Sequence, residues 1–280
     1  MSQPIIELHH VVKNYSPAPR KRFLSRREVV PTVNALSDIN LHIWPGEIFV
    51  IVGLSGSGKS TLLRTLNSLI TPTSGEVRFQ GQALGSLNAA EMIALRREKT
   101  GMVFQSFALF EERNVLDNVA FGLEVAGVAR EIRHQRAREM LAKVGLSHVE
   151  EKYPAELSGG MQQRVGLARA LVVNPAVLLM DEAFSALDPI IRREMQTLLL
   201  SLQDAEQRTI VFVTHDMEEA LRLGNRIAIM EAGKLIQVGT PEKIINAPAT
   251  SYVRHLFSGV DTSRWQLADS YADVWQPRRN

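Results

Sequence analysis

The chain has 280 residues, of which 45% are hydrophobic and 22% are charged, and its formal net charge is +2. This balance is that of a globular protein with a sizeable core, and the small net charge argues against a nucleic-acid partner. The absence of cysteine excludes disulfides, thiolate metal sites and cysteine nucleophiles.

The apolar segments are all shorter than the roughly 18 residues that a membrane-spanning helix needs. The first residues lack a basic leader and a long apolar stretch, so we expect no signal peptide. We therefore expect a soluble protein, and any role at a membrane would come through a partner.

The first predicted element is a strand over residues 5–15. The basic stretch at 20–27 is interpreted as a solvated surface loop, with a contact to anionic lipid head groups or to a partner as the alternative. Residues 39–52 predict a strand, a turn at Pro45-Gly46 and a second strand, Ile48–Val52. The unbroken apolar run of that second strand is typical of a buried parallel strand.

Residues 59–70 predict a helix, and the region from about 86 to 166 is interpreted as mostly helical. From Ala176 onward, apolar strands alternate with helical patterns, which predicts a parallel sheet covered on both faces. The residues after Pro241 are expected to form a weakly patterned tail.

The segment GLSGSGKS, Gly53 to Ser60, matches the phosphate-loop pattern G-x-x-x-x-G-K-S between an apolar strand and a helix. Glycines allow the backbone N–H groups to curl around a phosphate, and the helix N-terminus adds partial positive charge. We expect Lys59 to reach the β- and γ-phosphates of ATP and Ser60 to coordinate Mg²⁺. The alternative is a glycine-rich turn without a ligand. The predicted ATP-binding residues are Gly53, Leu54, Ser55, Gly56, Ser57, Gly58, Lys59, Ser60 and Thr61.

A second motif, VLLMDE, places Asp181 and Glu182 at the carboxyl end of an apolar strand, where ligands of open α/β sheets bind. We predict that Asp181 holds Mg²⁺ and that Glu182 orients and deprotonates the attacking water. The alternative is an acidic pair that only complements a helix dipole.

A third motif, LSGGMQQR, runs from Leu157 to Arg164. Ser158 is a natural helix N-cap, and the two glycines after it leave the helix entrance open to an anion. Read alone, the segment also fits an ordinary capped helix. Together with the two preceding motifs, it resembles the signature motif of the nucleotide-binding subunits of ATP-binding cassette (ABC) transporters, and this resemblance covers about residues 5–240.

The resemblance implies an α/β fold: a P-loop NTPase core with a mostly parallel sheet, an N-terminal antiparallel β portion and an inserted helical subdomain at about 106–166. The ABC ATPase domain would span residues 1–240, and residues 241–280 would form a C-terminal tail without a regulatory domain pair. The family works as a dimer, here expected to be a homodimer. The signature residues of one subunit would complete the ATP site of the other: Ser158, Gly159, Gly160 and Gln162.

The same resemblance assigns further roles. Gln105 would contact Mg²⁺ and water, and His215 would contact the γ-phosphate, so the implied catalytic residues are Glu182, His215 and Gln105. Tyr15 would stack on the adenine ring, with ordinary packing as the alternative. The implied Mg²⁺ ligands are Ser60, Gln105 and Asp181, and Ser185 and Asp188 would belong to a loop that lines the dimer interface.

Two stretches, 106–128 and 181–196, resemble the quaternary-amine branch of the family, which imports glycine betaine, proline and choline. Ala183 follows this branch, because many other importer subunits have proline there, whereas Glu111-Glu112 departs from its usual Pro followed by His or Arg. The resemblance implies transmembrane permease partners, an indirect substrate-binding protein, and a cytoplasmic location at the inner face of the plasma membrane. The alternatives are an importer motor for another solute, such as an amino acid, and a soluble non-transport ABC ATPase.

Overall fold

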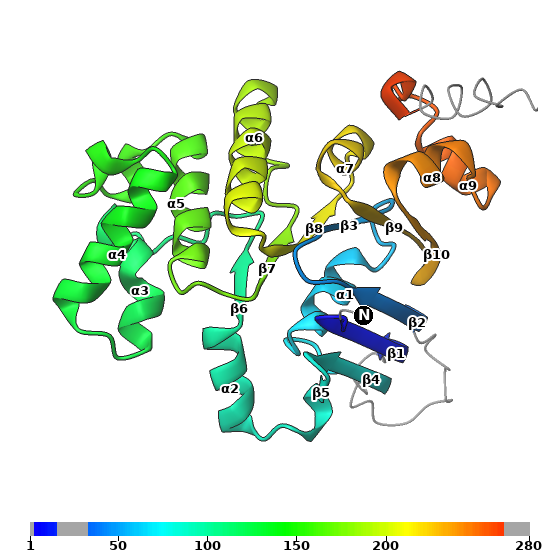
Figure 1. Cartoon of the computed structure of the whole chain (residues 1–280), viewed down its shortest axis with the longest axis horizontal. Helices are drawn as coiled ribbons and strands as arrows, with labels where there is room; N and C mark the ends of the chain where they lie inside the picture. The colour runs from blue at the N-terminus through cyan, green and yellow to red at the C-terminus, as the bar shows by residue number, and fades with distance from the viewer. Residues whose placement is uncertain (1–2, 16–32, 266–280) are drawn as a thin grey trace, which may run out of the picture.

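The computed structural model describes residues 3–15 and 33–265, and its centre is a six-stranded sheet (Figure 1). The strand order is β10-β9-β3-β8-β7-β6, and all neighbours are parallel except β10, which pairs antiparallel with β9. The strands are β3 (Ile48–Val52), β6 (Thr100–Val103), β7 (Val177–Asp181), β8 (Thr209–Thr214), β9 (Arg226–Glu231) and β10 (Lys234–Gly239). This confirms the mostly parallel sheet that the sequence predicts.

A second, four-stranded sheet is antiparallel, with the order β2-β1-β4-β5. Its strands are β1 (Ile6–Tyr15), β2 (Val33–Ile43), β4 (Ser74–Phe79) and β5 (Gln82–Ala83). The expected antiparallel portion is therefore present, and it draws on residues on both sides of the phosphate loop.

Strand β3 separates two hydrophobic cores. Ile48, Val50 and Val52 face a core shared with the helices, whereas Phe49 and Ile51 face a core shared with the four-stranded sheet. Because successive side chains of a strand point to opposite faces, a strand between two cores must be apolar at every position. This explains the unbroken run that marked the strand in the sequence.

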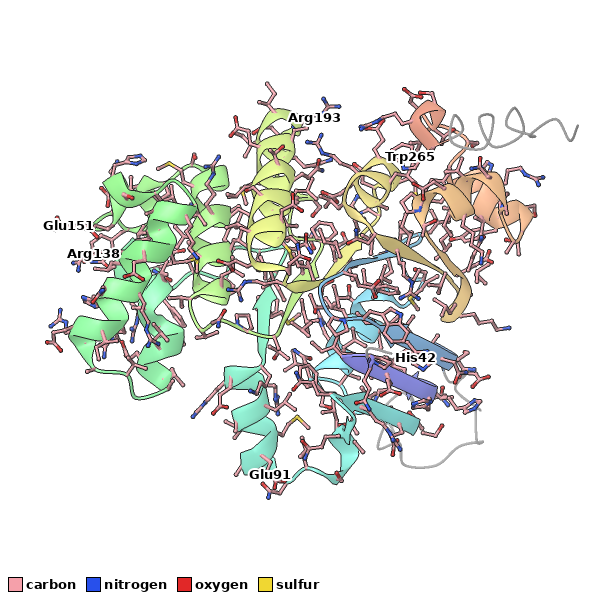
Figure 2. All side chains as sticks on the ribbon, viewed as in Figure 1. His42, Glu91, Arg138, Glu151, Arg193 and Trp265 are labelled. Atoms are coloured by element: carbon pink, nitrogen blue, oxygen red, sulfur yellow. The ribbon has the colours of Figure 1, made fainter. Side chains whose placement is uncertain are left out.

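The helices surround these sheets (Figure 1). A helical part is formed by α3 (Val115–Val125), α4 (Arg130–Lys143) and α5 (Gly159–Leu171), with the short 3-10 turns η2 (Ser147–Val149) and η3 (Pro154–Glu156); Figure 2 places Arg138 and Glu151 at its outer edge. The other helices are α1 (Lys59–Leu66), α2 (Ala89–Glu98), α6 (Pro189–Glu206), α7 (Met217–Leu223), α8 (Pro241–Asn246) and α9 (Ser251–Leu256), and a 3-10 turn, η1, spans Leu84–Ser86.

The structure adds to one sequence expectation and corrects two others. The region expected to be mostly helical contains β6, which joins the parallel sheet beside β7. The helix expected over 59–70 ends at Leu66, and Ser68 has a φ of 54° that interrupts any continuation. The tail beyond Pro241 forms α8 and α9; Ile244 of α8, Val253 of α9 and Phe257, which follows α9, lie in the core.

The basic stretch at 20–27 lies outside the described residues. Among the helices of residues 3–15 and 33–265, none has both the length and the apolar character to cross a membrane.

Candidate functional site

The motifs predicted from sequence converge because their strands are parallel and in register. Val52 of β3 pairs with Thr214 of β8, and Asp181 of β7 pairs with Val213 of β8. The residues that follow these strand ends therefore lie at one edge of the sheet, where open α/β folds bind ligands. Val103 of β6 pairs with Met180 at the same edge, so Gln105 follows two residues beyond the outermost strand.

The phosphate loop between β3 and α1 is shaped by close backbone packing. Gly58 has a φ of 102°, and a side chain on it would come within 2.4 Å of the Ala35 carbonyl oxygen. A side chain on Gly53 would come within 2.3 Å of the Met230 carbonyl oxygen. Glycine is required at both positions, because no larger residue fits without moving backbone atoms. The loop is thus wedged between β2 and the end of β9, with Leu54, Ser55 and Gly56 exposed at its open side.

Lys59 begins α1 and is buried. Its Nζ donates to the carbonyl oxygens of Gly53 and Leu54, at 3.0 and 3.1 Å, and lies 3.8 Å from Glu182 Oε1. Burial lowers the pKa of Lys59, and the negative charges of Glu182 and Asp181 oppose that shift. A buried ammonium group that is held by its own loop is well placed to exchange those carbonyls for an incoming phosphate.

Asp181 is buried at the end of β7 and joins the loop helix to the sheet. It accepts hydrogen bonds from Ser60 Oγ at 2.7 Å and from Arg64 Nη2 at 3.1 Å. A carboxylate and a hydroxyl oxygen side by side are ligands of the kind that Mg²⁺ prefers. The structure therefore brings the two predicted ligands Ser60 and Asp181 together.

Glu182 lies between Lys59 and His215. Beside its 3.8 Å approach to Lys59, its Oε2 lies 3.0 Å from Nδ1 of His215, whose side chain is more exposed than that of Glu182. The Glu182 backbone has a φ of 47°, a left-handed conformation that is unfavourable for this residue type. Its N–H donates to the Val213 carbonyl at 3.0 Å, which holds the strained turn against β8.

The loop that follows Glu182 is fastened by Arg192 of α6. Arg192 donates to the carbonyl oxygens of Phe184, Ser185 and Leu187, and its Nη1 lies 3.3 Å from Asp216 Oδ2, next to His215. Ser185 Oγ donates to the Glu182 carbonyl, and Asp188 caps α6 by accepting from the N–H groups of Ile190 and Ile191. This loop is therefore connected to both Glu182 and the His215 turn.

The signature segment lies elsewhere in the chain. Ser158 caps α5 by accepting from the Met161 N–H at 3.4 Å, as the sequence predicts for a helix entrance. Gly159 lies against the ring of Phe107, and Gly160 packs against Ile191 of α6. Figure 1 shows α5 and α1 apart, with β7 between them in this view.

Gln162, the remaining signature residue, is turned toward its own chain. Its Nε2 donates to the carbonyl oxygens of Pro154 and Leu157, at 3.0 and 3.3 Å. In a single chain it thus orders the turn before α5. The structure does not bring the signature residues to the phosphate loop of the same chain.

Gln105 lies at the same sheet edge as the site, whereas Tyr15 lies at the end of β1 in the antiparallel sheet. Gln105 is exposed just beyond β6, and the segment after it is held by Arg169, which donates to the carbonyls of Phe107 and Ala108. Burial lowers the pKa of Arg169. Tyr15 is 43% exposed at the end of β1, and its ring lies 5.2 Å from Lys13 Nζ.

Arginines are the residues that sequence reasoning missed. Arg64 stands four residues after Ser60, a spacing that places both on one face of α1. This spacing could have predicted that Arg64 lies near the same carboxylate as Ser60. Arg169 donates to carbonyls about 60 residues away in the chain, and Arg192 donates to carbonyls of the loop just before α6. Nothing in their spacing indicated these contacts.

The comparisons with known proteins agree with this geometry. The family model for ABC transporters matches residues 36–185. The glycine betaine/proline betaine transport system ATP-binding protein ProV of Salmonella typhimurium is 52% identical over 268 residues, which cover 92% of this chain and 67% of ProV. The glycine betaine/carnitine transport ATP-binding protein GbuA of Listeria monocytogenes is 51% identical over 88% of this chain and 63% of its own length, so this chain spans less than two thirds of GbuA.

Solved structures share the fold. A dimeric structure of the ATP-binding cassette MJ0796 in a post-hydrolysis state, bound to ADP and Pi, superposes with a TM-score of 0.74 at 34% identity, covering 84% of this chain and 98% of that one. The family model covers more than half of the chain, and ProV matches it over most of its length. The chain belongs to the ABC transporter family.

Proposed function

We propose that this chain is the ATP-binding and ATP-hydrolysing subunit of a bacterial importer for glycine betaine, proline betaine or a related quaternary amine. The observation that carries the proposal is the gathering of Lys59, Ser60, Asp181, Glu182 and His215 at one edge of the parallel sheet. A phosphate loop, a carboxylate beside its hydroxyl and a second carboxylate with a histidine are the parts that ATP hydrolysis needs.

The residues fit ATP and Mg²⁺. Ser57 Oγ is buried in the phosphate loop without a hydrogen-bond partner, and Lys59 Nζ donates to two carbonyls that a phosphate can replace. Ser60 and Asp181 would hold Mg²⁺, with Gln105 at the same sheet edge. When bound, Mg²⁺ neutralises charge on the phosphate oxygens.

Glu182 is the proposed general base. Its carboxylate accepts a proton from a water whose oxygen attacks the γ-phosphorus of ATP, and ADP leaves with the bridging oxygen. Lys59 binds the phosphates that carry the negative charge, and His215, 3.0 Å from Glu182, fixes the direction of the carboxylate. Tyr15 is proposed to stack on the adenine ring, because it is exposed at the end of β1.

The proposed working unit contains two copies of this chain. The signature residues Ser158, Gly159 and Gly160 stand at the entrance of a helix, where partial positive charge favours a phosphate, yet they lie away from the phosphate loop of their own chain. A second copy would bring its signature to that loop, and the loop of Ser185 and Asp188 would line the interface. The dimeric cassette with ADP and Pi supports this arrangement.

The remaining proposals follow from the importer. Permease subunits would carry the membrane-spanning segments, a substrate-binding protein would deliver the solute, and this chain would lie at the cytoplasmic face of the plasma membrane. The names of ProV and GbuA support the betaine class of solute. We further propose that the ATPase domain ends near residue 240 and that residues 106–166 form its helical subdomain.

Titrating the associated substrate-binding protein with betaine, choline and proline tests the proposed solute. Tight binding of an unrelated solute alone would refute the betaine proposal.

The activity itself is tested with Glu182→Gln. The amide cannot accept the proton of water, so we expect Mg²⁺-dependent ATP hydrolysis to fall by about 10²- to 10⁴-fold while ATP affinity is retained. Phosphate release and calorimetric titration measure the two quantities. Glu151→Gln, an exposed residue at the outer edge of the helical part, is the control and should hydrolyse ATP normally. Hydrolysis by Glu182→Gln at the wild-type rate would show that Glu182 is not the base.

A further inference from the structure

Helix α9, near the end of the described chain, reaches the phosphate loop. The hydroxyl of Tyr252 donates a hydrogen bond to the carbonyl oxygen of Met230 at 3.3 Å. That carbonyl is the atom against which Gly53 packs so closely that a side chain would come within 2.3 Å of it. Met230 also supports the far end of the loop, because its Cε lies 3.3 Å from the position that a side chain on Gly58 would take.

The same hydroxyl meets the loop directly. Burial raises the pKa of Tyr252, and a hydrogen bond from the backbone of Leu54 opposes this shift. The Leu54 carbonyl on the next peptide accepts from Lys59 Nζ. The backbone of Leu54 is therefore contacted by two side chains: its N–H by Tyr252 and its carbonyl oxygen by Lys59.

Helix α9 is a firm support for this contact. Val253 and the following Phe257 are buried in the core that β3 shares with the helices. Thr250 caps the helix by accepting a hydrogen bond from the Val253 N–H. The segment before the helix is tied to β10, because Gln237 donates to the Ala247 carbonyl and accepts from the Ala249 N–H. The ring of Tyr252 packs against the same core.

We propose that Tyr252 is a positioning residue for the phosphate loop, which makes the docked C-terminal helix part of the ATP-binding apparatus. The inference rests on the proposed function. When Lys59 turns from the Gly53 and Leu54 carbonyls toward phosphate, the loop loses these two hydrogen bonds and keeps the one from the Ser57 N–H to the Leu54 carbonyl. The Tyr252 hydroxyl keeps its contacts with the Leu54 backbone and the Met230 carbonyl. It therefore holds these groups in the conformation that receives phosphate. It touches neither the water nor the γ-phosphate, so its effect is on ATP binding rather than on the chemical step.

Tyr252→Phe tests this, because it removes only the hydroxyl and keeps the packed ring. The loss of the hydroxyl's contacts with Met230 and Leu54 predicts an ATP affinity weaker by about two- to tenfold. With ATP in saturating amounts, the hydrolysis rate should stay within about twofold of wild type. Calorimetric titration with a non-hydrolysable ATP analogue gives the affinity, steady-state kinetics gives kcat and KM, and thermal unfolding shows whether the variant is folded.

Tyr153→Phe is the matched control, because Tyr153 is exposed in the helical part and the chemical change is the same. It should leave the affinity unchanged. Equal affinity of wild type and Tyr252→Phe would overturn the inference while leaving the proposed function intact. A fall in kcat and in thermal stability without a rise in KM would overturn it as well, because that pattern belongs to a purely structural residue. A wild-type chain that binds no ATP analogue would overturn both proposals.

Discussion

At the scale of single residues, the contacts of the Lys59 side chain suit the phosphate loop to binding an anion. Its ammonium group is buried, donates to two carbonyls of its own loop and lies 3.8 Å from Glu182. Burial lowers its pKa and the two carboxylates of the site counter that effect. The two carboxylates thus favour the charged form of Lys59, which interacts more strongly with an anion than with carbonyls.

Lys59→Ala is therefore expected to weaken nucleotide binding itself. Losing a charge-assisted contact predicts an affinity for ATP lower by about 10- to 100-fold. Isothermal titration of the two proteins with ATP measures the change, and Lys234→Ala, at an exposed position of β10, is the control. An unaltered affinity in Lys59→Ala would mean that the loop does not face the phosphates.

The turn that contains His215 lies between β8 and α7, and α7 contacts α6. Glu219 of α7 is buried, and its Oε1 accepts from Gln196 Nε2 of α6 at 3.0 Å. Burial raises the pKa of Glu219 above its ordinary value of 4.5, and hydrogen bonds from Thr214 and Gln196 partly offset the shift. The folded chain therefore binds this proton more tightly than the unfolded chain does. The contribution of Glu219 to stability falls as pH rises from 4.5 through its folded pKa.

Glu219→Gln removes this titration and keeps an oxygen that can accept from Gln196. We expect the variant to gain stability relative to wild type as pH rises above the ordinary glutamate range, and the gain to level off once Glu219 is ionised in the folded wild type. Thermal unfolding of both proteins between about pH 4.5 and pH 8 measures the difference. Glu218→Gln, at the exposed neighbouring position, should show no such trend. Parallel curves for wild type and Glu219→Gln would contradict the assignment.

The elements that could be predicted from the sequence are those whose local residue pattern is distinctive. Strand β3 was recognisable because both of its faces are buried, and the phosphate loop because only glycines fit against Met230 and Ala35. Strand β6 was missed, since four residues including a glycine carry little periodicity after the charged helix α2. Local patterns reach no further than such short-range features.

Side chains that act between distant segments were beyond prediction from sequence. Arg169 donates to two carbonyls about 60 residues earlier, Arg192 contacts Asp216 of the turn after β8, and Tyr252 contacts a loop nearly 200 residues earlier in the chain. These partners come together only through the order of strands in the sheet. The turning of Gln162 toward Pro154 and Leu157 likewise depends on the folded turn before α5.

At the scale of the whole molecule, we propose that one chain carries two separated halves of an ATP site. The phosphate loop, Asp181 and Glu182 would form one half, and the entrance of α5 would form the other. Ser158→Arg separates their roles, because it blocks the helix entrance without touching the phosphate loop. We expect this variant to bind ATP as a single chain with wild-type affinity and to lose hydrolysis. A loss of ATP affinity like that of Lys59→Ala would place Ser158 in the site of its own chain.

The most direct test is the molar mass of the Glu182→Gln chain in solution, measured by light scattering with and without ATP and Mg²⁺. Without nucleotide, we expect the 31.2 kDa of one chain. With ATP, which this variant holds without hydrolysing it, we expect twice that mass, and adding Ser158→Arg should return the mass to that of one chain. A mass that stays at one chain while ATP is bound would contradict the two-chain site.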